Sequence, residues 1–264
     1  MNRIDERMNS VRAEGRKALA AFLTVGDPNI EVSKAAVRAM QEEGVDLIEL
    51  GVPFSDPAAD GPVIQAADER AIANGTDIFR VFDMVKEIRE EIEIPMVFLL
   101  YYNIIVQYGE ERFFKKCAEV GVDGLIIPDL PYEEREDISE YVDKYGVYQN
   151  YLVSPTSHER IQKIASEAKG FLYCVSSLGV TGEKSSFQTD FDEFFGMIKK
   201  YTEVPALVGF GISNGEQVKE LSSYCDGAII GSALVKAIAD GKTAEESIAG
   251  LREKLRDLRS GIVA

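Results

Sequence analysis

Eight short apolar runs, each followed by a stretch with helical spacing, constrain the fold of this chain more than any other feature. Apolar strands that alternate with amphipathic helices indicate βα units and a parallel sheet. Eight such units suffice to close the sheet into a barrel. The predicted strands are Leu19–Thr24, Asp46–Leu50, Met96–Leu100, Gly124–Ile127, Tyr148–Leu152, Phe171–Val175, Ala206–Gly209 and Gly227–Ile230.

Helical periodicity and helix-start motifs support the segments between the strands. Apolar residues at spacings of three and four favour helices with one buried face. Three S/T-x-x-E motifs have the spacing of a capping box, which satisfies free N–H groups of a first turn. No long linker interrupts the series, so we predict one α/β domain over 1–264, a (β/α)8 TIM barrel with an N-terminal helical extension. The apolar series are Ile78, Phe82, Val85, Ile88 and Ile248, Leu251, Leu255, Leu258; the motifs are Thr156 with Glu159, Ser213 with Glu216, and Thr243 with Glu246.

The charge and cysteine content exclude several classes of protein. Acidic residues outnumber basic ones by 45 to 29, a formal charge of −16, which disfavours nucleic acid or an anionic membrane as the main partner. An anionic substrate would have to be held by local donors such as helix N-termini. Three cysteines without CxxC spacing indicate neither a disulfide framework nor a zinc site, and favour a reducing cytoplasm. We find no signal peptide and no transmembrane run.

A faint internal repeat draws attention to one carboxylate. The segments GVDLIEL from Gly44, GVDGLII from Gly121 and CDGAIIG from Cys225 each place an aspartate before an apolar strand. In this register Ile126 takes the place of Glu49, so the strand favours an apolar residue there. A buried, unpaired carboxylate is costly and is tolerated mainly where it has a function. Glu49 is therefore a candidate catalytic residue at the carboxyl end of a barrel strand, although a buried ion pair is the alternative.

A second carboxylate, Asp60, follows Glu49 by eleven residues across a turn-rich loop. The two carboxylates could converge over the mouth of the barrel, where one would act as a general acid and the other as a general base. If the barrel interior desolvates Glu49, its pKa should rise, so that the group both donates and accepts a proton near neutrality. The alternative for Asp60, and for Asp56 beside it, is that they cap turns or the next helix.

Three glycine-containing segments late in the chain predict a phosphate site. They are LGVTG at 178–182, GFGIS at 209–213 and IIGSALV at 229–235. The last two end strands seven and eight and begin helices, which is where barrels commonly bind phosphate through backbone donors. The glycines could otherwise serve only to make turns.

Few other side chains offer proton chemistry. His158 is the only histidine, and it lies inside the Thr156 motif, where we expect a solvated residue in a first helical turn. Tyr101, Tyr102 and Tyr173 occupy or follow strand ends, where they could line a pocket or pack in the core.

Taken together, these segments resemble the tryptophan synthase alpha subunit family. The resemblance covers nearly the whole chain, and its second segment is highly specific. The matching segments are FLTVGDP, IELGVPFSDPAADGPVIQ, YYNIIVQYG, GVDGLIIPDLPYEE, LVSPTS, SSLGVTG, VGFGIS and IIGSALV, in the order of the family.

The resemblance implies a TIM-barrel lyase that cleaves indole-3-glycerol phosphate into indole and glyceraldehyde 3-phosphate in tryptophan biosynthesis. Members work in an α2β2 heterotetramer with a beta subunit, which receives the indole through a tunnel and joins it to serine with pyridoxal phosphate. This chain would then need neither a metal nor an organic cofactor of its own. The segment from Val52 to Asp60 resembles a cover of the active site that also contacts the partner.

The same resemblance assigns roles to individual residues. Glu49 matches the general acid and base, and Asp60 matches the carboxylate that stabilises the activated indole ring. Thr181 falls in the matching mobile lid. The residues that match phosphate donors are Gly182, Gly211, Gly231 and Ser232, and those that match the substrate pocket are Phe22, Leu100, Tyr102, Leu125, Ile127, Asp129 and Tyr173.

Two other functions fit parts of this pattern. Another phosphate-binding barrel, acting as an isomerase or synthase on a related sugar phosphate, would share the glycine loops but not the segment IELGVPFSDPAADGP. A non-catalytic barrel that only regulates a partner subunit would not need the carboxylates at Glu49 and Asp60.

Overall fold

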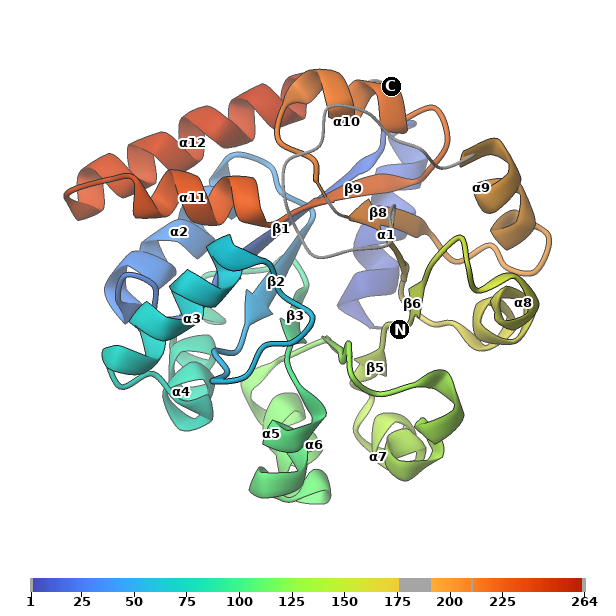
Figure 1. Ribbon diagram of the computed structural model, residues 1–264, viewed down its shortest axis with the longest axis horizontal. Helices are drawn as coiled ribbons and strands as arrows, with labels where there is room; N and C mark the ends of the chain where they lie inside the picture. The colour runs from blue at the N-terminus through green and yellow to red at the C-terminus, as the bar shows by residue number, and fades with distance from the viewer. Residues whose placement is uncertain (1, 176–190, 210, 263–264) are drawn as a thin grey trace.

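A parallel sheet curls into a barrel that is surrounded by helices (Figure 1). The computed structural model describes residues 2–175, 191–209 and 211–262. Every pair of neighbouring strands in the sheet runs parallel, in the order β5-β4-β3-β2-β1-β9-β8-β7-β6. The strands are β1 (Ala18–Thr24), β2 (Leu47–Gly51), β3 (Met96–Leu99), β4 (Gly124–Ile126), β5 (Tyr148–Gln149), β6 (Leu152–Val153), β7 (Leu172–Val175), β8 (Ala206–Gly209) and β9 (Gly227–Ile230).

The two edge strands of this order, β5 and β6, are consecutive in the chain, and together they close the barrel. Between them the Asn150 N–H donates to the carbonyl of Leu125 at 2.8 Å. The N–H of Tyr173 donates to the carbonyl of Tyr151 at 2.9 Å. One extended stretch therefore pairs with β4 through its first half and with β7 through its second half. The predicted strand Tyr148–Leu152 is this stretch, interrupted at its centre, and the barrel prediction is confirmed.

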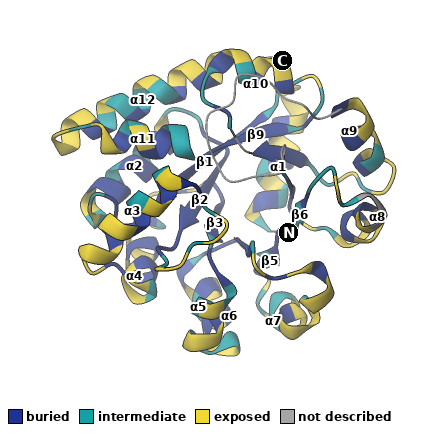
Figure 2. Cartoon of the chain, in the orientation of Figure 1, coloured by how far each residue is buried: buried dark blue, intermediate teal, exposed yellow. Residues whose placement is uncertain are grey.

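The helices present their apolar faces to the outside of the sheet, so that buried residues point inward and exposed residues outward (Figure 2). Their bounds are α1 (Arg3–Ala13), α2 (Ile30–Glu42), α3 (Pro62–Ala73), α4 (Ile78–Ile88), α5 (Tyr102–Tyr108), α6 (Glu110–Val120), the 3-10 turn η1 (Tyr132–Glu134), α7 (Glu136–Tyr145), α8 (His158–Glu167), α9 (Phe191–Lys199), α10 (Gly215–Leu221), α11 (Ser232–Ala239) and α12 (Ala244–Ser260).

Only one of the three predicted helix caps is confirmed. Thr243 caps α12, since its side chain accepts from the N–H of Glu246. Asn214, not Ser213, caps α10. Helix α8 begins after Ser157, one residue beyond the predicted Thr156, and no side chain caps it. Both wrong predictions chose a serine or threonine that stands one residue before the cap position, where several short polar residues compete.

Side chains of each strand alternate between two cores, because successive residues of a strand point to opposite faces of the sheet. Ile48 and Phe98 join the outer core between sheet and helices, whereas Leu47 and Val97 lie inside the barrel. The N-terminal helix α1 completes the inner core by packing Ile4, Met8 and Val11 against it. The predicted helical extension therefore closes the amino-terminal opening of the barrel.

The aspartates of the internal repeat have a structural role at this closed end. Each carboxylate accepts a backbone N–H of the neighbouring strand at 2.9 Å, so the repeat marks equivalent positions around the barrel. Arginines of α1 bond to two of these carboxylates, which ties the helix to the strand ends. The three pairs are Asp46 with Leu19, Asp123 with Met96, and Asp226 with Ala206.

Removal of the buried Asp46 side chain should destabilise the fold without touching the opposite end of the barrel. Asp46 is fully buried and pairs with Arg16 at 2.7 Å and Arg7 at 2.8 Å. Asp46→Ala removes the partner of Arg7, one of the two partners of Arg16 and the acceptor of a strand N–H, so we expect a loss of about 3 kcal/mol in the free energy of unfolding. Urea denaturation measures it, with Asp83→Ala as the exposed control, for which we expect less than about 0.5 kcal/mol. An unchanged midpoint for Asp46→Ala would contradict this role.

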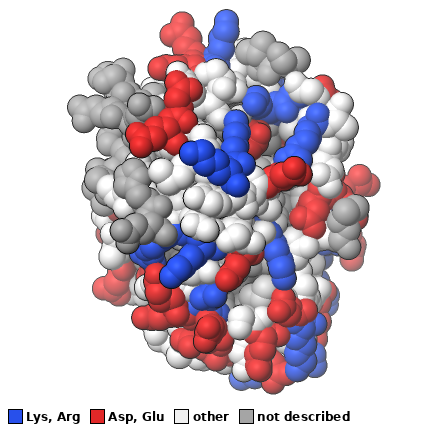
Figure 3. Space-filling model, turned by 90° about the vertical axis from the view of Figure 1, so that its right-hand side faces the viewer, with Lys and Arg blue, Asp and Glu red and all other residues white. Residues whose placement is uncertain are grey.

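The surface carries both signs of charge. On the face drawn in Figure 3, lysine and arginine are interspersed with aspartate and glutamate, so no broad basic patch forms there. Among the described residues, no helix is both long enough and apolar enough to cross a membrane.

Candidate active site

Glu49 lies on β2 with its carboxylate inside the barrel, because its neighbours in sequence face the outer core. It is 1% exposed, and its Oε1 atom has no hydrogen-bond partner among the described residues. Nor does any described lysine or arginine form an ion pair with it, which leaves the ion-pair alternative without support. Burial alone raises the pKa of Glu49 to about 8, so the group is mainly protonated at neutral pH and still exchanges its proton readily.

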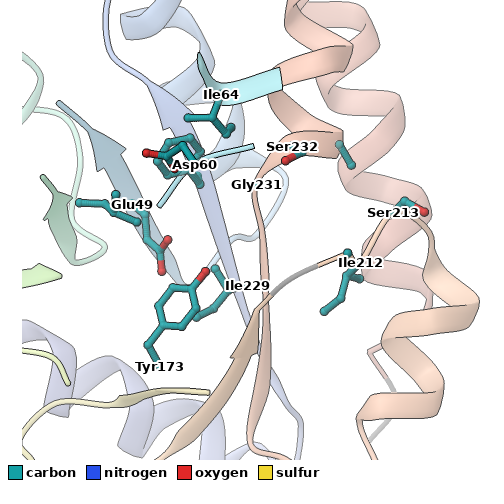
Figure 4. A pocket seen from close by; sticks show the side chains of 13 residues that line it. Glu49, Asp60, Ile64, Tyr173, Ile212, Ser213, Ile229, Gly231 and Ser232 are labelled. Atoms are coloured by element: carbon teal, nitrogen blue, oxygen red, sulfur yellow. The ribbon is translucent and has the colours of Figure 1, made fainter. Parts of the chain in front are cut away.

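Glu49 opens into a cavity at the carboxyl ends of the strands, the face on which barrel enzymes place their active sites. In Figure 4 the side chains of Glu49 and Tyr173 reach toward one another across this cavity, with Asp60 above them. A Cβ at Gly209 would lie 2.5 Å from the Tyr173 hydroxyl, so only glycine permits this position of the ring. The empty space in and in front of the cavity is about 610 Å³, part of it open to solvent. The lining residues are Phe22, Glu49, Asp60, Ile64, Leu99, Tyr173, Gly211, Ile212, Ser213, Ile229, Gly231, Ser232 and Ala233.

Asp60 lies on the loop between β2 and α3 and is held by a tyrosine. The Tyr101 hydroxyl donates to Asp60 Oδ2 at 2.6 Å and accepts from the N–H of Ala59 at 2.9 Å. Asp60 does not cap α3, since the N-cap is Gly61 and no side-chain bond forms there. Burial raises the pKa of Asp60, while the Tyr101 hydrogen bond opposes this rise. The fixed Asp60 carboxylate therefore faces the same cavity as Glu49.

The opposite side of the cavity offers backbone donors. Gly231 directly follows β9 and is the N-cap of α11, which begins at Ser232. The first N–H groups of a helix have no acceptor within the helix, and they attract anions together with the helix dipole. Gly211 has φ of +74°, a left-handed conformation that favours glycine. No lysine or arginine occurs among the described lining residues, so an anion here would rely on these backbone groups.

The structure brings together seven of the predicted site residues and leaves others apart. Glu49, Asp60, Phe22, Tyr173, Gly211, Gly231 and Ser232 all line the cavity. Thr181 and Gly182 lie outside the described residues.

Five predicted pocket residues do not line the cavity. Leu100, Leu125 and Ile127 are buried in the outer core, on the face of the sheet that the helices cover. The backbone N–H of Tyr102 donates to Asp129 Oδ1 at 2.9 Å, and the Tyr102 hydroxyl bonds to Glu110. For the three apolar residues the reason is strand parity, since a shift of one residue moves a side chain to the other face of the sheet. Tyr102 instead begins α5, and Asp129 lies in the turn after β4.

Residues next to two of these line the cavity or contact a residue that does. Leu99 lines the cavity instead of Leu100, and Tyr101 rather than Tyr102 contacts a catalytic candidate. Ile229 also lines the cavity. The internal repeat contained a signal for it, because Ile229 stands at the same repeat position as Glu49. Ile64 and Ile212 also line the cavity, but no repeat or motif in the sequence pointed to them.

A closed parallel barrel, with an isolated carboxylate in its cavity and a helix N-terminus opposite, defines the chain as a TIM barrel whose cavity offers groups for carboxylate chemistry. The family model described as tryptophan synthase alpha chain matches residues 8–262. The chain belongs to this family and is therefore a lyase.

The alignments with individual relatives extend over almost the whole of this chain and of each relative. The tryptophan synthase alpha chain of Thermoanaerobacter sp. (strain X514) is 49% identical over 98% of this chain and 99% of its own. That of Alkaliphilus metalliredigens is 43% identical over the same shares. Among solved structures, Mycobacterium tuberculosis tryptophan synthase in space group F222 gives a TM-score of 0.90 at 34% identity and 98% coverage of both chains. The tryptophan synthase subunit alpha of Legionella pneumophila str. Paris gives 0.83 at 35% identity, covering 97% of this chain and 99% of its own.

Proposed function

We propose that this chain cleaves indole-3-glycerol phosphate into indole and glyceraldehyde 3-phosphate, with Glu49 as general acid and base. The observation that carries the proposal is the unpaired Glu49 carboxyl inside the barrel, where burial brings its pKa to about 8. A group with this pKa can deliver and take up a proton at neutral pH.

The proposed reaction requires two proton movements around one carbon–carbon bond. A proton delivered to indole C3 makes the ring cationic, with the charge shared by the ring nitrogen. Loss of the proton from the hydroxyl on the adjacent side-chain carbon then forms the aldehyde. The bond between C3 and that carbon breaks, and its electron pair restores the indole ring. Glu49 can supply the first proton and, once ionised, accept the second.

Asp60 would stabilise the cation formed in between. A carboxylate fixed beside the ring nitrogen offsets positive charge as it develops, and this effect is strong where water is excluded. The Tyr101 hydroxyl at 2.6 Å supports the proposal, because its hydrogen bond favours the ionised form of Asp60. Phe22, Ile64 and Leu99 provide apolar walls suited to an indole ring.

The start of α11 is our proposed phosphate site, and a charge placed there tests it. Ser232→Asp puts a carboxylate in the first turn, which stabilises the helix through its dipole but repels a phosphate. We therefore expect the KM for the phosphorylated substrate to rise at least about tenfold with a largely unchanged kcat. Ser232→Asn, of the same shape without the charge, is the control. Equal KM values for the two variants would contradict a phosphate at α11.

We further propose that the chain works with a beta subunit in an α2β2 assembly in the cytoplasm, and that pyridoxal phosphate belongs to that partner. Family membership supports the partner, and the three free, buried cysteines are compatible with a reducing compartment. Size-exclusion chromatography of the chain mixed with a beta subunit should show a larger complex. An unshifted elution at micromolar concentrations would contradict the assembly.

Two alternatives have weaker support. An isomerase or synthase barrel would turn over phosphoribosyl compounds, so a parallel assay with these and with indole-3-glycerol phosphate separates the two enzyme classes. A purely regulatory barrel does not need a buried, unpaired carboxylate such as Glu49 in an open cavity. Release of indole by the isolated chain would exclude that role.

A further inference from the structure

Phe22 is an aromatic residue of the cavity wall and stands directly opposite Glu49. The two residues are partners in the register of the parallel strands β1 and β2, and both line the cavity. Neighbouring strands lie only about 4.8 Å apart, so the direction of the Phe22 ring decides how much room is left beside the proposed acid.

The Phe22 ring reaches along the sheet toward Gly51 of β2. Gly51 is two residues beyond Glu49, on the same face of the strand. A Cβ at Gly51 would lie 2.5 Å from Cζ and 2.7 Å from Cε2 of Phe22, which are atoms at the far end of the ring. Carbon atoms in contact lie about 3.5 Å or more apart, so a side chain at position 51 would displace the end of the ring by about 1 Å. The ring therefore occupies space that only glycine leaves free.

The other sides of the Phe22 ring are packed. Phe22 is 5% exposed and forms a small apolar cluster with Ile64 and Ala67 of α3 and Val235 of α11. Its Cβ, Cγ and Cδ1 atoms lie 3.8 to 3.9 Å from the position of a Cβ at Gly231, which is ordinary van der Waals contact. Of the sides that the described residues define, only the one toward the cavity is free, so a displaced ring would move into the cavity.

The backbone of Gly51 does not by itself require glycine. Positive φ angles occur at other glycines of the described chain, but not at Gly51. A glycine inside a strand costs stability relative to alanine, and it often marks a place where another group approaches closely. A Cβ at Gly51 would also lie 3.3 Å from the Leu23 carbonyl oxygen, a tight contact that a shift of a few tenths of an ångström relieves. The severe contact is the one with the Phe22 ring.

We propose that Gly51 is a positioning residue that sets the width of the cavity: without a side chain, it lets the Phe22 ring lie against β2 and leaves room for a bicyclic aromatic ring beside Glu49. This inference rests on the proposed function, because it takes the indole part of the substrate to enter this space. It also makes a claim that is independent of activity, namely that a side chain at position 51 turns the Phe22 ring into the cavity. Gly51 itself does not line the cavity.

Crystal structures of the wild type and of Gly51→Ala test the claim about the ring. We expect the end of the Phe22 ring in Gly51→Ala to lie about 1 Å or more further into the cavity. A ring that keeps its place while β2 moves away from it would overturn the positioning role, whatever reaction the chain catalyses.

Binding of indole measures the width of the cavity without turnover. The chain contains no tryptophan, so the fluorescence of bound indole is observed without a tryptophan background. We expect Gly51→Ala to raise the Kd for indole at least about tenfold. The matched control is Gly196→Ala in α9, at an exposed glycine whose Cβ position has no atom within 4 Å, and it should bind indole like the wild type. A Kd for Gly51→Ala within about twofold of the wild type would overturn the inference.

Steady-state kinetics with indole-3-glycerol phosphate should show the same loss in KM. The substrate and the transition state need the same space, so we expect Gly51→Ala to raise KM at least about tenfold while kcat changes less than about threefold. A purely structural defect would instead lower the melting temperature and the amount of active protein, with an unchanged KM. That result would contradict the inference.

A double-mutant cycle tests whether Gly51 acts through Phe22. The side chain in Phe22→Leu ends before the two atoms that approach Gly51, so in this background Gly51→Ala should change KM and Kd less than about twofold. An equal rise in both backgrounds would assign the effect to the Leu23 carbonyl and overturn the path through Phe22. If Gly51→Ala alone does not fold, the double variant should fold, because the severe contact is gone. Failure of the double variant to fold, where Phe22→Leu folds, would also overturn the inference.

The outcomes separate this inference from the proposed function. A wild type that releases no indole from indole-3-glycerol phosphate would overturn the function, while the position of the Phe22 ring would still test Gly51. A wild type that releases indole, beside a folded Gly51→Ala variant with unchanged Kd and KM, would overturn the inference alone.

Discussion

Glu49→Gln is expected to lower kcat for indole release by at least about a thousandfold, because the amide can neither donate nor accept the transferred proton near neutral pH. The side chain keeps its volume, so substrate binding should change little. Steady-state assay of purified chains with indole-3-glycerol phosphate measures the loss. Glu90→Gln, at an exposed glutamate in the turn after α4, is the matched control and should retain full activity.

The same substitution should change stability with a predictable dependence on pH. The pKa of Glu49 is near 8 in the folded chain and about 4.5 when unfolded, so the folded state binds more protons between these values. Its contribution to stability is therefore complete below pH 4.5 and is lost as the pH rises through 8. Relative to the wild type, Glu49→Gln should melt at a similar temperature at pH 5 and roughly 10 °C higher at pH 9. If the wild type melted at a higher temperature than Glu49→Gln at pH 9, this would contradict the buried, unpaired state of Glu49.

The second large effect is expected for Asp60→Asn, which should lower kcat by about a hundredfold or more while KM changes less than threefold. The amide oxygen can still accept the hydrogen bond from the Tyr101 hydroxyl, so the loop between β2 and α3 should stay in place. The negative charge that offsets the cationic ring is lost, however. Steady-state kinetics separates kcat from KM, and melting temperature confirms the fold. If Asp60 served only to hold the loop between β2 and α3 in place, Asp60→Asn would retain nearly full activity.

The architecture was predictable because it depends on patterns that repeat along the chain. The eight predicted strands occur within a residue or two of their expected bounds, and only Tyr148–Leu152 is interrupted, at Asn150 and Tyr151. The catalytic candidates were predictable for a related reason. Glu49 breaks the apolar pattern of its strand, and such a break at the carboxyl end of a barrel strand points to chemistry.

The details that the sequence leaves open depend on single-residue register. Apolar runs such as MVFLL offer leucines on both faces of the strand, so the sequence does not show whether Leu99 or Leu100 faces the cavity. The same ambiguity applies to the double tyrosine at 101 and 102.

The most direct test of the account is the product analysis of a single reaction, indole-3-glycerol phosphate with the purified wild-type chain, run with and without a beta subunit. The account predicts that indole and glyceraldehyde 3-phosphate appear in equal amounts, faster with the partner. Absence of both products, under conditions in which the partner is shown to be bound, would contradict it.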